Sequence, residues 1–96
     1  MFLVKCTFQL RERGLFVMSG EVVEGPIRAG MFVHLPMNAS LRLTAPIDAI
    51  EVAWTGESTQ VCLCFKGDSE ALAFLTGLNI GADEPEMVEV SETGQR

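Results

Sequence analysis

Residues 41–54 read LRLTAPIDAIEVAW, and this stretch decides the fold. Apolar side chains alternate with other residues in its first half, at Leu41, Leu43, Ala45 and Ile47. They alternate again in its second half, but in the opposite phase, at Ile50, Val52 and Trp54. Alternation with a period of two is typical of a strand with one buried face, and a one-residue slip would turn the second set to solvent. We therefore predict a bulge or a strand break near Asp48 and Ala49, which keeps both sets against one core.

The other strand signals lie on both sides of this stretch. Residues 2–10 alternate well, and this alternation puts on one predicted face Phe2, Val4, Cys6, Phe8 and Leu10. Residues 15–24 form a longer strand that Ser19 and Gly20 interrupt, and a glycine inside a strand often marks a bend or a bulge. Residues 61–65 are apolar on both faces, as in a central or barrel-closing strand. Shorter strands are predicted at residues 31–35, 78–80 and 87–90, with a turn at residues 37–40.

Together these signals predict an all-β fold: a small closed antiparallel β-barrel of six to seven short strands with at most one short helix. Closure removes the exposed strand edges that otherwise promote aggregation, and an open sandwich is the second choice. The helix is expected within residues 67–75. Asp68 or Ser69 can cap its start, and Leu72 and Leu75 are spaced to lie on one face.

The composition indicates one globular domain. The chain has 96 residues, and we expect a single domain over residues 1–90 followed by a polar tail over residues 91–96. Hydrophobic residues make up 48% of the chain, which excludes disorder for most of it, and no apolar run approaches the ~20 residues of a membrane-spanning helix. The net charge of −6 disfavours RNA and argues against DNA or an anionic membrane as partner, because binding to phosphates needs a basic face.

The three cysteines favour a reducing compartment. Their number is odd, and Cys62 and Cys64 on one extended strand would lie ~6.6 Å apart, beyond comfortable disulfide reach. The first residues, MFLVKC, lack the basic and apolar regions of a secretory signal. We therefore expect reduced thiols and a cytoplasmic location.

The cysteines and the single histidine do not form a convincing reactive site. Structural zinc prefers cysteine pairs that wrap a turn, whereas Cys62 and Cys64 fall on a strand, and no pattern brings His34 to a thiol in a cleft. We expect no metal, no cofactor and no catalytic residue, so the chain is not predicted to be an enzyme. The thiols are expected to pack as small apolar side chains. His34 is expected to be exposed, in the phase opposite to Val33 and Leu35.

Acidic residues gather near the C-terminus, at Asp83, Glu84, Glu86, Glu89 and Glu92. Their spacing lacks the alternation of a calcium-binding loop. We interpret them as solvated charge that guards an edge strand, since charged side chains on an edge discourage pairing with other chains. An acidic docking strip for a basic partner is the functional alternative.

Residues 20–33 read GEVVEGPIRAGMFV and carry a pattern of glycines and apolar residues, at Gly20, Gly25, Ile27, Arg28, Gly30 and Val33. This pattern resembles the signature of the second domain of translation GTPases of the elongation factor Tu kind. Residues 47–51 are similar to a following Val-x-x-Ile-Glu strand of that family, and residues 75–80 to its closing segment. Met31 stands where the family has Asp, and the chain contains no P-loop for nucleotide phosphates. The resemblance implies a non-catalytic β-barrel module, which in the family docks on the nucleotide domain and contacts aminoacyl-tRNA or ribosomal RNA.

The candidate binding residues are Arg11, Arg13 and Trp54. The two arginines share a predicted turn, and Trp54 precedes another turn, where it can serve as an interface anchor or pack at the end of the barrel. We expect a binding module whose partner is a protein or a second copy, reached through a sheet edge or the Trp54 loop. One alternative is a ribosome- or tRNA-associated accessory protein, which requires a cluster of arginines, namely Arg11, Arg13, Arg28 and Arg42. The other is a small-ligand-binding or enzyme-accessory protein with a pocket near His34 or the thiols.

Substitution of the turn glycines tests the turn assignment. We expect Gly25→Val and Gly30→Val each to destabilise the fold, because the turn pattern predicts positive φ angles that a β-branched residue adopts only with strain. Thermal unfolding measures the effect. Wild-type melting temperatures in both variants would contradict the assignment.

Overall fold

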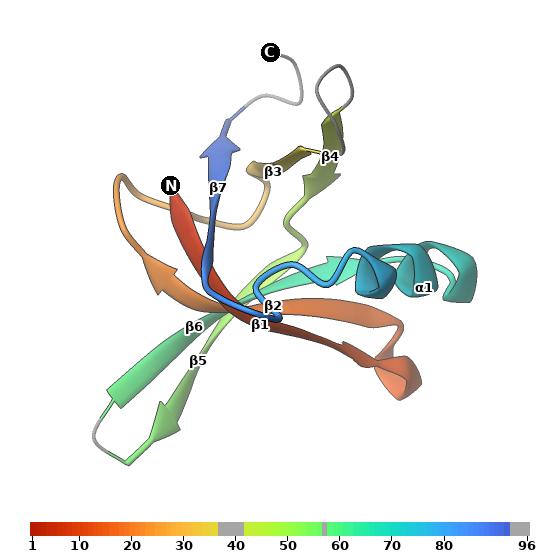
Figure 1. Ribbon diagram of the computed structural model, residues 1–96, viewed down its shortest axis with the longest axis horizontal. Helices are drawn as coiled ribbons and strands as arrows, with labels where there is room; N and C mark the ends of the chain where they lie inside the picture. Colours follow the sequence, from red (N-terminus) through yellow and green to blue (C-terminus); the bar gives the residue numbers. More distant parts are fainter. Residues whose placement is uncertain (37–41, 57, 93–96) are drawn as a thin grey trace.

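The computed structural model describes residues 1–36, 42–56 and 58–92. In this part, seven strands form one antiparallel sheet in the order β4-β3-β7-β1-β2-β6-β5 (Figure 1). The strands are β1 (Phe2–Leu10), β2 (Leu15–Val22), β3 (Phe32–Pro36), β4 (Arg42–Pro46), β5 (Ala49–Thr55), β6 (Ser58–Lys66) and β7 (Glu86–Ser91). A 3-10 turn, η1 (Arg11–Arg13), follows β1, and the helix α1 (Ser69–Gly77) follows β6. The all-β class and the antiparallel strands are therefore confirmed.

The predicted break between β4 and β5 falls at Ile47 and Asp48, which we call the corner. The Ile47 backbone donates to the carbonyl of Met31 at 2.8 Å and accepts from the amide of Gly30 at 2.9 Å. The next amide, of Asp48, donates to the carbonyl of Cys64 on β6 at 2.8 Å. The corner is thus bonded to the segment before β3 on one side and to β6 on the other, and the Ile47 side chain is buried. Leu43, Ala45 and Ile50 pack against one core because the chain changes sheet partners between the two runs, whereas Val52 and Trp54 of the second run are exposed.

The sheet is not closed into a barrel, so this part of the prediction is wrong. β4 and β5 stand at opposite ends of the strand order, and no ladder among the described residues pairs one with the other. They are joined by the chain through the corner instead of by strand–strand hydrogen bonds. Sequence alternation did not reveal this, because a strand at an edge and a strand inside a barrel wall have the same period.

Strand β7 connects the two parts of the sheet. Its first residues pair with β1, with Val88 opposite Phe2, and its last residues pair with β3, with Ser91 opposite Phe32. Each half of β7 has a ladder on one side only, residues 86–88 with β1 and residues 89–91 with β3. The interpretation of the acidic residues here as charge that guards a strand edge stays a prediction.

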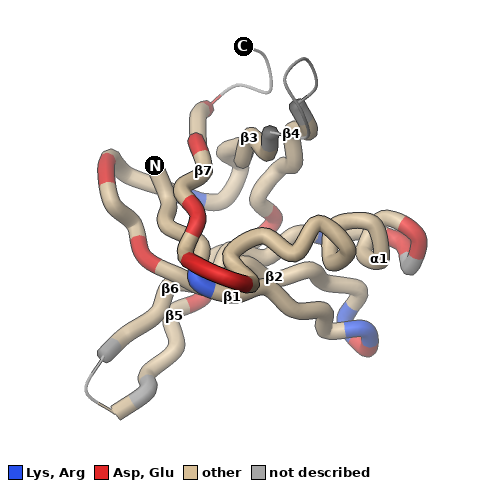
Figure 2. The backbone as a smooth tube through the Cα atoms, in the orientation of Figure 1, with Lys and Arg blue, Asp and Glu red and all other residues tan. Residues whose placement is uncertain are grey.

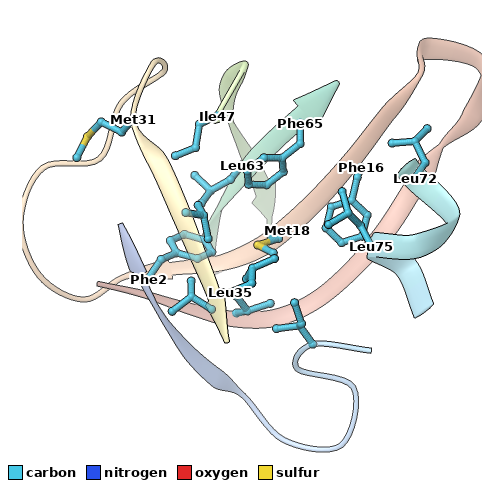
Figure 3. Packing of buried hydrophobic residues seen from close by; sticks show 14 residues of the cluster. Phe2, Phe16, Met18, Met31, Leu35, Ile47, Leu63, Phe65, Leu72 and Leu75 are labelled. Atoms are coloured by element: carbon cyan, nitrogen blue, oxygen red, sulfur yellow. The ribbon is translucent and has the colours of Figure 1, made fainter. Parts of the chain in front are cut away.

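The core lies on the concave side of the sheet, where side chains of the strands and of α1 point toward one another (Figure 3). It includes Phe2, Phe16, Met18, Met31, Leu35, Ile47, Leu63, Phe65, Leu72 and Leu75. The helix contributes Leu72 and Leu75 and packs against β1 and β2. As the capping signal predicted, Asp68 accepts a hydrogen bond at 2.8 Å from the amide of Ala71.

A bulge in β1 changes which side chains face the core. Val4 lies opposite Gly20 and Cys6 lies opposite Ser19, so Lys5 is one residue too many in β1. The extra residue reverses the alternation, which leaves Phe2 and Val4 buried but turns Cys6 and Phe8 to the outer, exposed side. The prediction that all five apolar residues of β1 share one face is therefore wrong. The interruption predicted within the second strand is wrong as placed: β2 continues through Ser19 and Gly20, and the bulge lies opposite them, in β1.

Residues 78–80 do not form the predicted strand. Asn79 has a positive φ of 51°, so the chain turns here instead of adding a strand to the sheet. The Ile80 side chain is buried in the core. Gly25 and Gly30 have φ angles of 75° and 95°, as the turn pattern predicted. The predicted turn at residues 37–40 and the tail residues 93–96 lie outside the described residues. Among the residues described, no helix is long and apolar enough to cross a bilayer.

The bulge explains the glycine at position 20, and a substitution tests it. A Cβ at Gly20 would lie 1.9 Å from the carbonyl oxygen of Leu3, so Gly20→Ala must push β1 and β2 apart. We expect a loss of about 1–3 kcal/mol in the free energy of unfolding, or failure to fold. Gly77→Ala is the matched control, because nothing lies within 4 Å of its Cβ position. Urea unfolding followed by circular dichroism measures both, and equal stability of the two variants would contradict the close approach.

Candidate functional site

The β5–β6 hairpin extends beyond the rest of the sheet (Figure 1). Its ladder runs from the pair Ala49–Cys64 to the pair Thr55–Ser58. The ladder between β2 and β6 ends earlier, at the pair Gly20–Val61. Within the described chain, residues 53–55 and 58–60 at the end of the hairpin therefore pair only with each other. We call the whole β5–β6 hairpin the arm.

The arm exposes apolar side chains that continue the core-facing side of β5. Ile50 packs against the core, whereas Val52 and Trp54, in the same phase, are 60% and 77% exposed. Val22, at the end of β2, is 42% exposed, and Val61, opposite Val52, is half-buried. The sequence left Trp54 between a core and a surface position, and the structure places it on the surface. These four residues (Val22, Val52, Trp54 and Val61) form the arm strip.

Strand β5 also has an open edge. It ends the strand order, and its outer side faces no other strand of the described chain. In an antiparallel ladder, every second residue of such a strand turns its N–H and C=O groups away from its one partner. Proteins usually protect edges with lysine, proline, a bulge or short length, but β5 is seven residues long and reads AIEVAWT. The arm therefore combines unpaired backbone groups with exposed apolar side chains.

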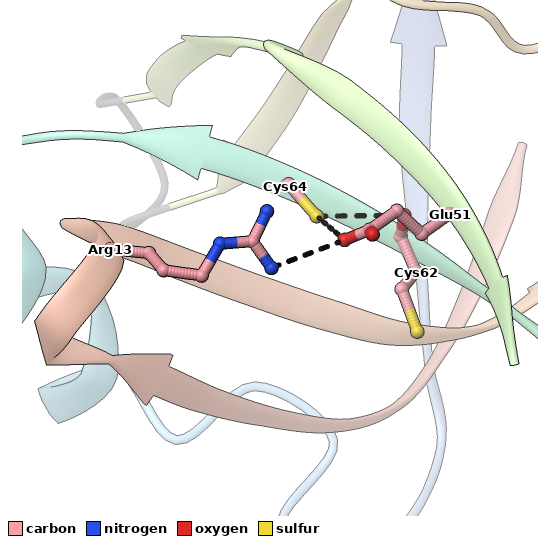
Figure 4. A network of polar contacts seen from close by, with 4 residues as sticks. All are labelled: Arg13, Glu51, Cys62 and Cys64. Carbon is pink, nitrogen blue, oxygen red and sulfur yellow. Dashed lines mark hydrogen bonds and ion pairs between the residues drawn. The ribbon is translucent and has the colours of Figure 1, made fainter.

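The outer face of β2 and β6 carries a small second core. Leu15, Val17 and Cys64 are buried there, with Leu10, Ala49 and Cys62 packed against them. Glu51 lies over this cluster: its carboxylate accepts a hydrogen bond from the Cys64 thiol at 3.5 Å and is 3.8 Å from the guanidinium of Arg13 (Figure 4). Arg13 and Glu51 thus form a long ion pair at the surface, with both side chains more than half exposed.

The Cys64 thiol is held in its protonated form. Its side chain is 1% exposed, and burial, with the Glu51 carboxylate beside it, raises the pKa of Cys64 to about 11. Such a thiol is a poor nucleophile at neutral pH, because the thiolate is the reactive species. Cys62 is half-buried and Cys6 is exposed, so packing as a small apolar side chain is complete only for Cys64.

Arg11 and Arg13 share the η1 turn and line one groove there, whereas Arg28 lies in the loop before β3. Lys5 pairs with Glu21, Arg28 with Glu92, and Lys66 with Asp48. The positive charges are accordingly spread over the molecule (Figure 2). Arg11 lines a shallow groove of about 370 Å³ beside the start of α1, together with Gln9, Gly14, Gly67, Leu72 and Ala73. The side chain of Arg42 is not among those that the structure describes.

His34 is buried, so the prediction that it is exposed is wrong. It is 3% exposed, with Nε2 2.6 Å from the Ser91 hydroxyl and Nδ1 3.3 Å from the Thr44 hydroxyl. β3 lies between β4 and β7, and neighbours on both sides cover the ring. The cysteines lie on β1 and β6, in the other part of the sheet. The described residues contain no group of three or more His, Cys, Asp or Glu side chains that could hold a metal.

No protein-family model, curated protein or solved structure matches the chain. The resemblance to the translation-factor domain therefore stays a hypothesis from the sequence. Sequence reasoning named Trp54 but missed Val22, Val52 and the open edge of β5. The available signal was Gly56 between two alternating runs, which indicates a hairpin, but the point where β2 stops pairing with β6 depends on the three-dimensional register.

The raised pKa of Cys64 predicts alkaline destabilisation. The native thiol stays protonated to about pH 11, whereas the unfolded chain loses this proton near pH 9, so the unfolded state binds fewer protons between these values. We expect the free energy of unfolding to fall by about 2–3 kcal/mol more in the wild type than in Cys64→Val across this range. The chain has no tyrosine to add a titration here. Cys6→Val is the control, and it should keep the wild-type slope; parallel pH profiles for wild type and Cys64→Val would contradict the assignment.

Proposed function

We propose that the protein is a non-catalytic protein-binding module and that the arm is its contact surface. The observation that carries this proposal is the exposure of Trp54 and Val52 on a hairpin whose outer strand has no partner among the described residues. Tryptophan is among the residues most enriched at the energetic centres of protein interfaces. An exposed strand edge beside it offers backbone hydrogen bonds to an added strand.

The energetic reason is that the arm strip leaves a large apolar area in water. Burying an indole side chain removes on the order of 150–250 Å², worth about 4–6 kcal/mol at about 25 cal/mol per Å². Part of this gain offsets the entropy lost on association. The exposed members of the strip contribute little to the stability of the isolated chain, because Val22, Val52 and Trp54 are 42%, 60% and 77% exposed. Their contribution is realised when another molecule covers them.

The alternatives have less support. A ribosome- or tRNA-associated role needs a cluster of cations, whereas Arg13, Arg28 and two lysines each contact a carboxylate at separate places. A ligand pocket near His34 or the thiols is also not favoured. Neither the groove beside the start of α1 nor a second groove at residues 9–13 is lined by His34 or a cysteine. The resemblance to a translation-factor module is compatible with a protein-binding role, since in that family the domain docks on another domain.

Matched surface variants test the proposal. Trp54→Ser removes the largest exposed side chain of the arm, and Phe74→Ser removes an exposed aromatic side chain from α1, away from the arm. In affinity capture from the native cell extract, we expect the proteins retained by the wild type to be retained by Phe74→Ser and reduced at least tenfold by Trp54→Ser. Circular dichroism confirms that both variants are folded. Equal retention by all three proteins would overturn the proposal.

A further inference from the structure

We infer that a second copy of this chain pairs with the open edge of β5, antiparallel and across a two-fold axis, so that two seven-stranded sheets join into one. This inference rests on the proposed function, because it names the occupant of the same arm. The two ends of the sheet differ in how readily they can pair with another strand. β4, at the other end, is five residues long and finishes in Pro46, both of which limit pairing. β5 has neither feature.

The sequence of β5 is complementary to itself in one antiparallel register. A two-fold axis perpendicular to the sheet pairs side chains of the same face, so the axis lies midway between two copies of one residue. We name each register by that residue. With the axis at Val52, all seven residues of β5 find partners: Val52 faces Val52, Ile50 faces Trp54, and Glu51 faces Ala53. The apolar pairs then lie on the core-facing side. Each Trp54 covers the half-buried Ile50 of the other copy, which continues the core of both.

The neighbouring registers pair fewer residues, and their facing side chains are less complementary. An axis at Glu51 places two carboxylates directly opposite each other, which destabilises the pair of strands, and only five residues of each β5 remain paired. An axis at Ala53 also pairs only five residues and leaves Ile50 without Trp54. In the register centred on Val52, Glu51 meets only a small alanine and keeps its ion pair with Arg13. Charge and apolar pairing therefore select the same register.

The charge of the chain predicts an unusual salt dependence. Each copy carries a net charge of −6, so two copies repel each other, and salt screens that repulsion. The contact itself consists of backbone hydrogen bonds and apolar side chains. Dimerisation should therefore strengthen as the salt concentration rises. Binding of a basic protein or of RNA to this acidic chain would weaken instead.

Charge substitutions at Ala53 identify the register. Ala53 is exposed and faces Glu51 of the other copy, so Ala53→Glu should weaken dimerisation at least tenfold, whereas Ala53→Lys should leave it unchanged or tighten it. If the axis passed through Ala53, both variants would weaken the dimer, and if it passed through Glu51, neither would. Either of those patterns overturns the proposed pairing. Val23→Lys, an exposed valine outside β5, is the control and should dimerise as the wild type does.

Sedimentation equilibrium of the full chain, from low to high micromolar concentration, gives the dissociation constants. Trp54 is the chain's single tryptophan, so its emission reports directly on the arm and should shift to shorter wavelength as the dimer forms. A monomer at every concentration overturns the inference. If the chain is monomeric but Trp54→Ser still reduces the proteins captured from extract, the proposed function stands and the inferred dimer is wrong. If Trp54→Ser changes neither the dimerisation nor the captured proteins, the proposed function and the inferred dimer are both wrong.

Discussion

The corner at Ile47 and Asp48 determines how the sheet is built. Three backbone hydrogen bonds link these two residues to Gly30, Met31 and Cys64, that is, to segments at both ends of the strand order. The amide and carbonyl groups of a buried turn must find partners, and here those partners belong to both parts of the sheet. The buried Ile47 side chain adds apolar contact at the same point. The sheet therefore curves around one core although its end strands are not paired.

The same corner has a consequence for β5. Because the chain enters β5 directly from the core, Ile50 still packs against that core, but β5 then leads away from it for the length of the hairpin. The phase that buries Ile50 carries Val52 and Trp54 on past the last residue of β2 that pairs with β6. The exposed strip is thus a continuation of the core face beyond the core. A closed barrel would have covered both the strip and the edge.

The sequence predicted this fold where local patterns are sufficient. The phase change between residues 41–47 and 50–54 located the corner, and Asp68 located the start of α1. Prediction from the sequence failed where a neighbouring strand determines the register or the burial of a residue. The bulge at Lys5 is required by its neighbour Gly20, but the alternation of β1 itself shows no sign of it. His34 is buried because β3 lies between two strands, and Trp54 is exposed because β2 ends early, and both facts depend on strand order.

The network on the outer face links the arm to the rest of the molecule. Glu51 belongs to β5, yet its carboxylate contacts Arg13 at the β1–β2 turn and the Cys64 thiol on β6. A strand at the end of a sheet has backbone partners on one side only, and this side-chain contact reaches across β6 to the β1–β2 turn. Arg13 was predicted as a binding residue, but its observed contact is with the arm. This contact supports the first residues of β5 and leaves the opposite side of the strand, with Val52 and Trp54, open to another molecule.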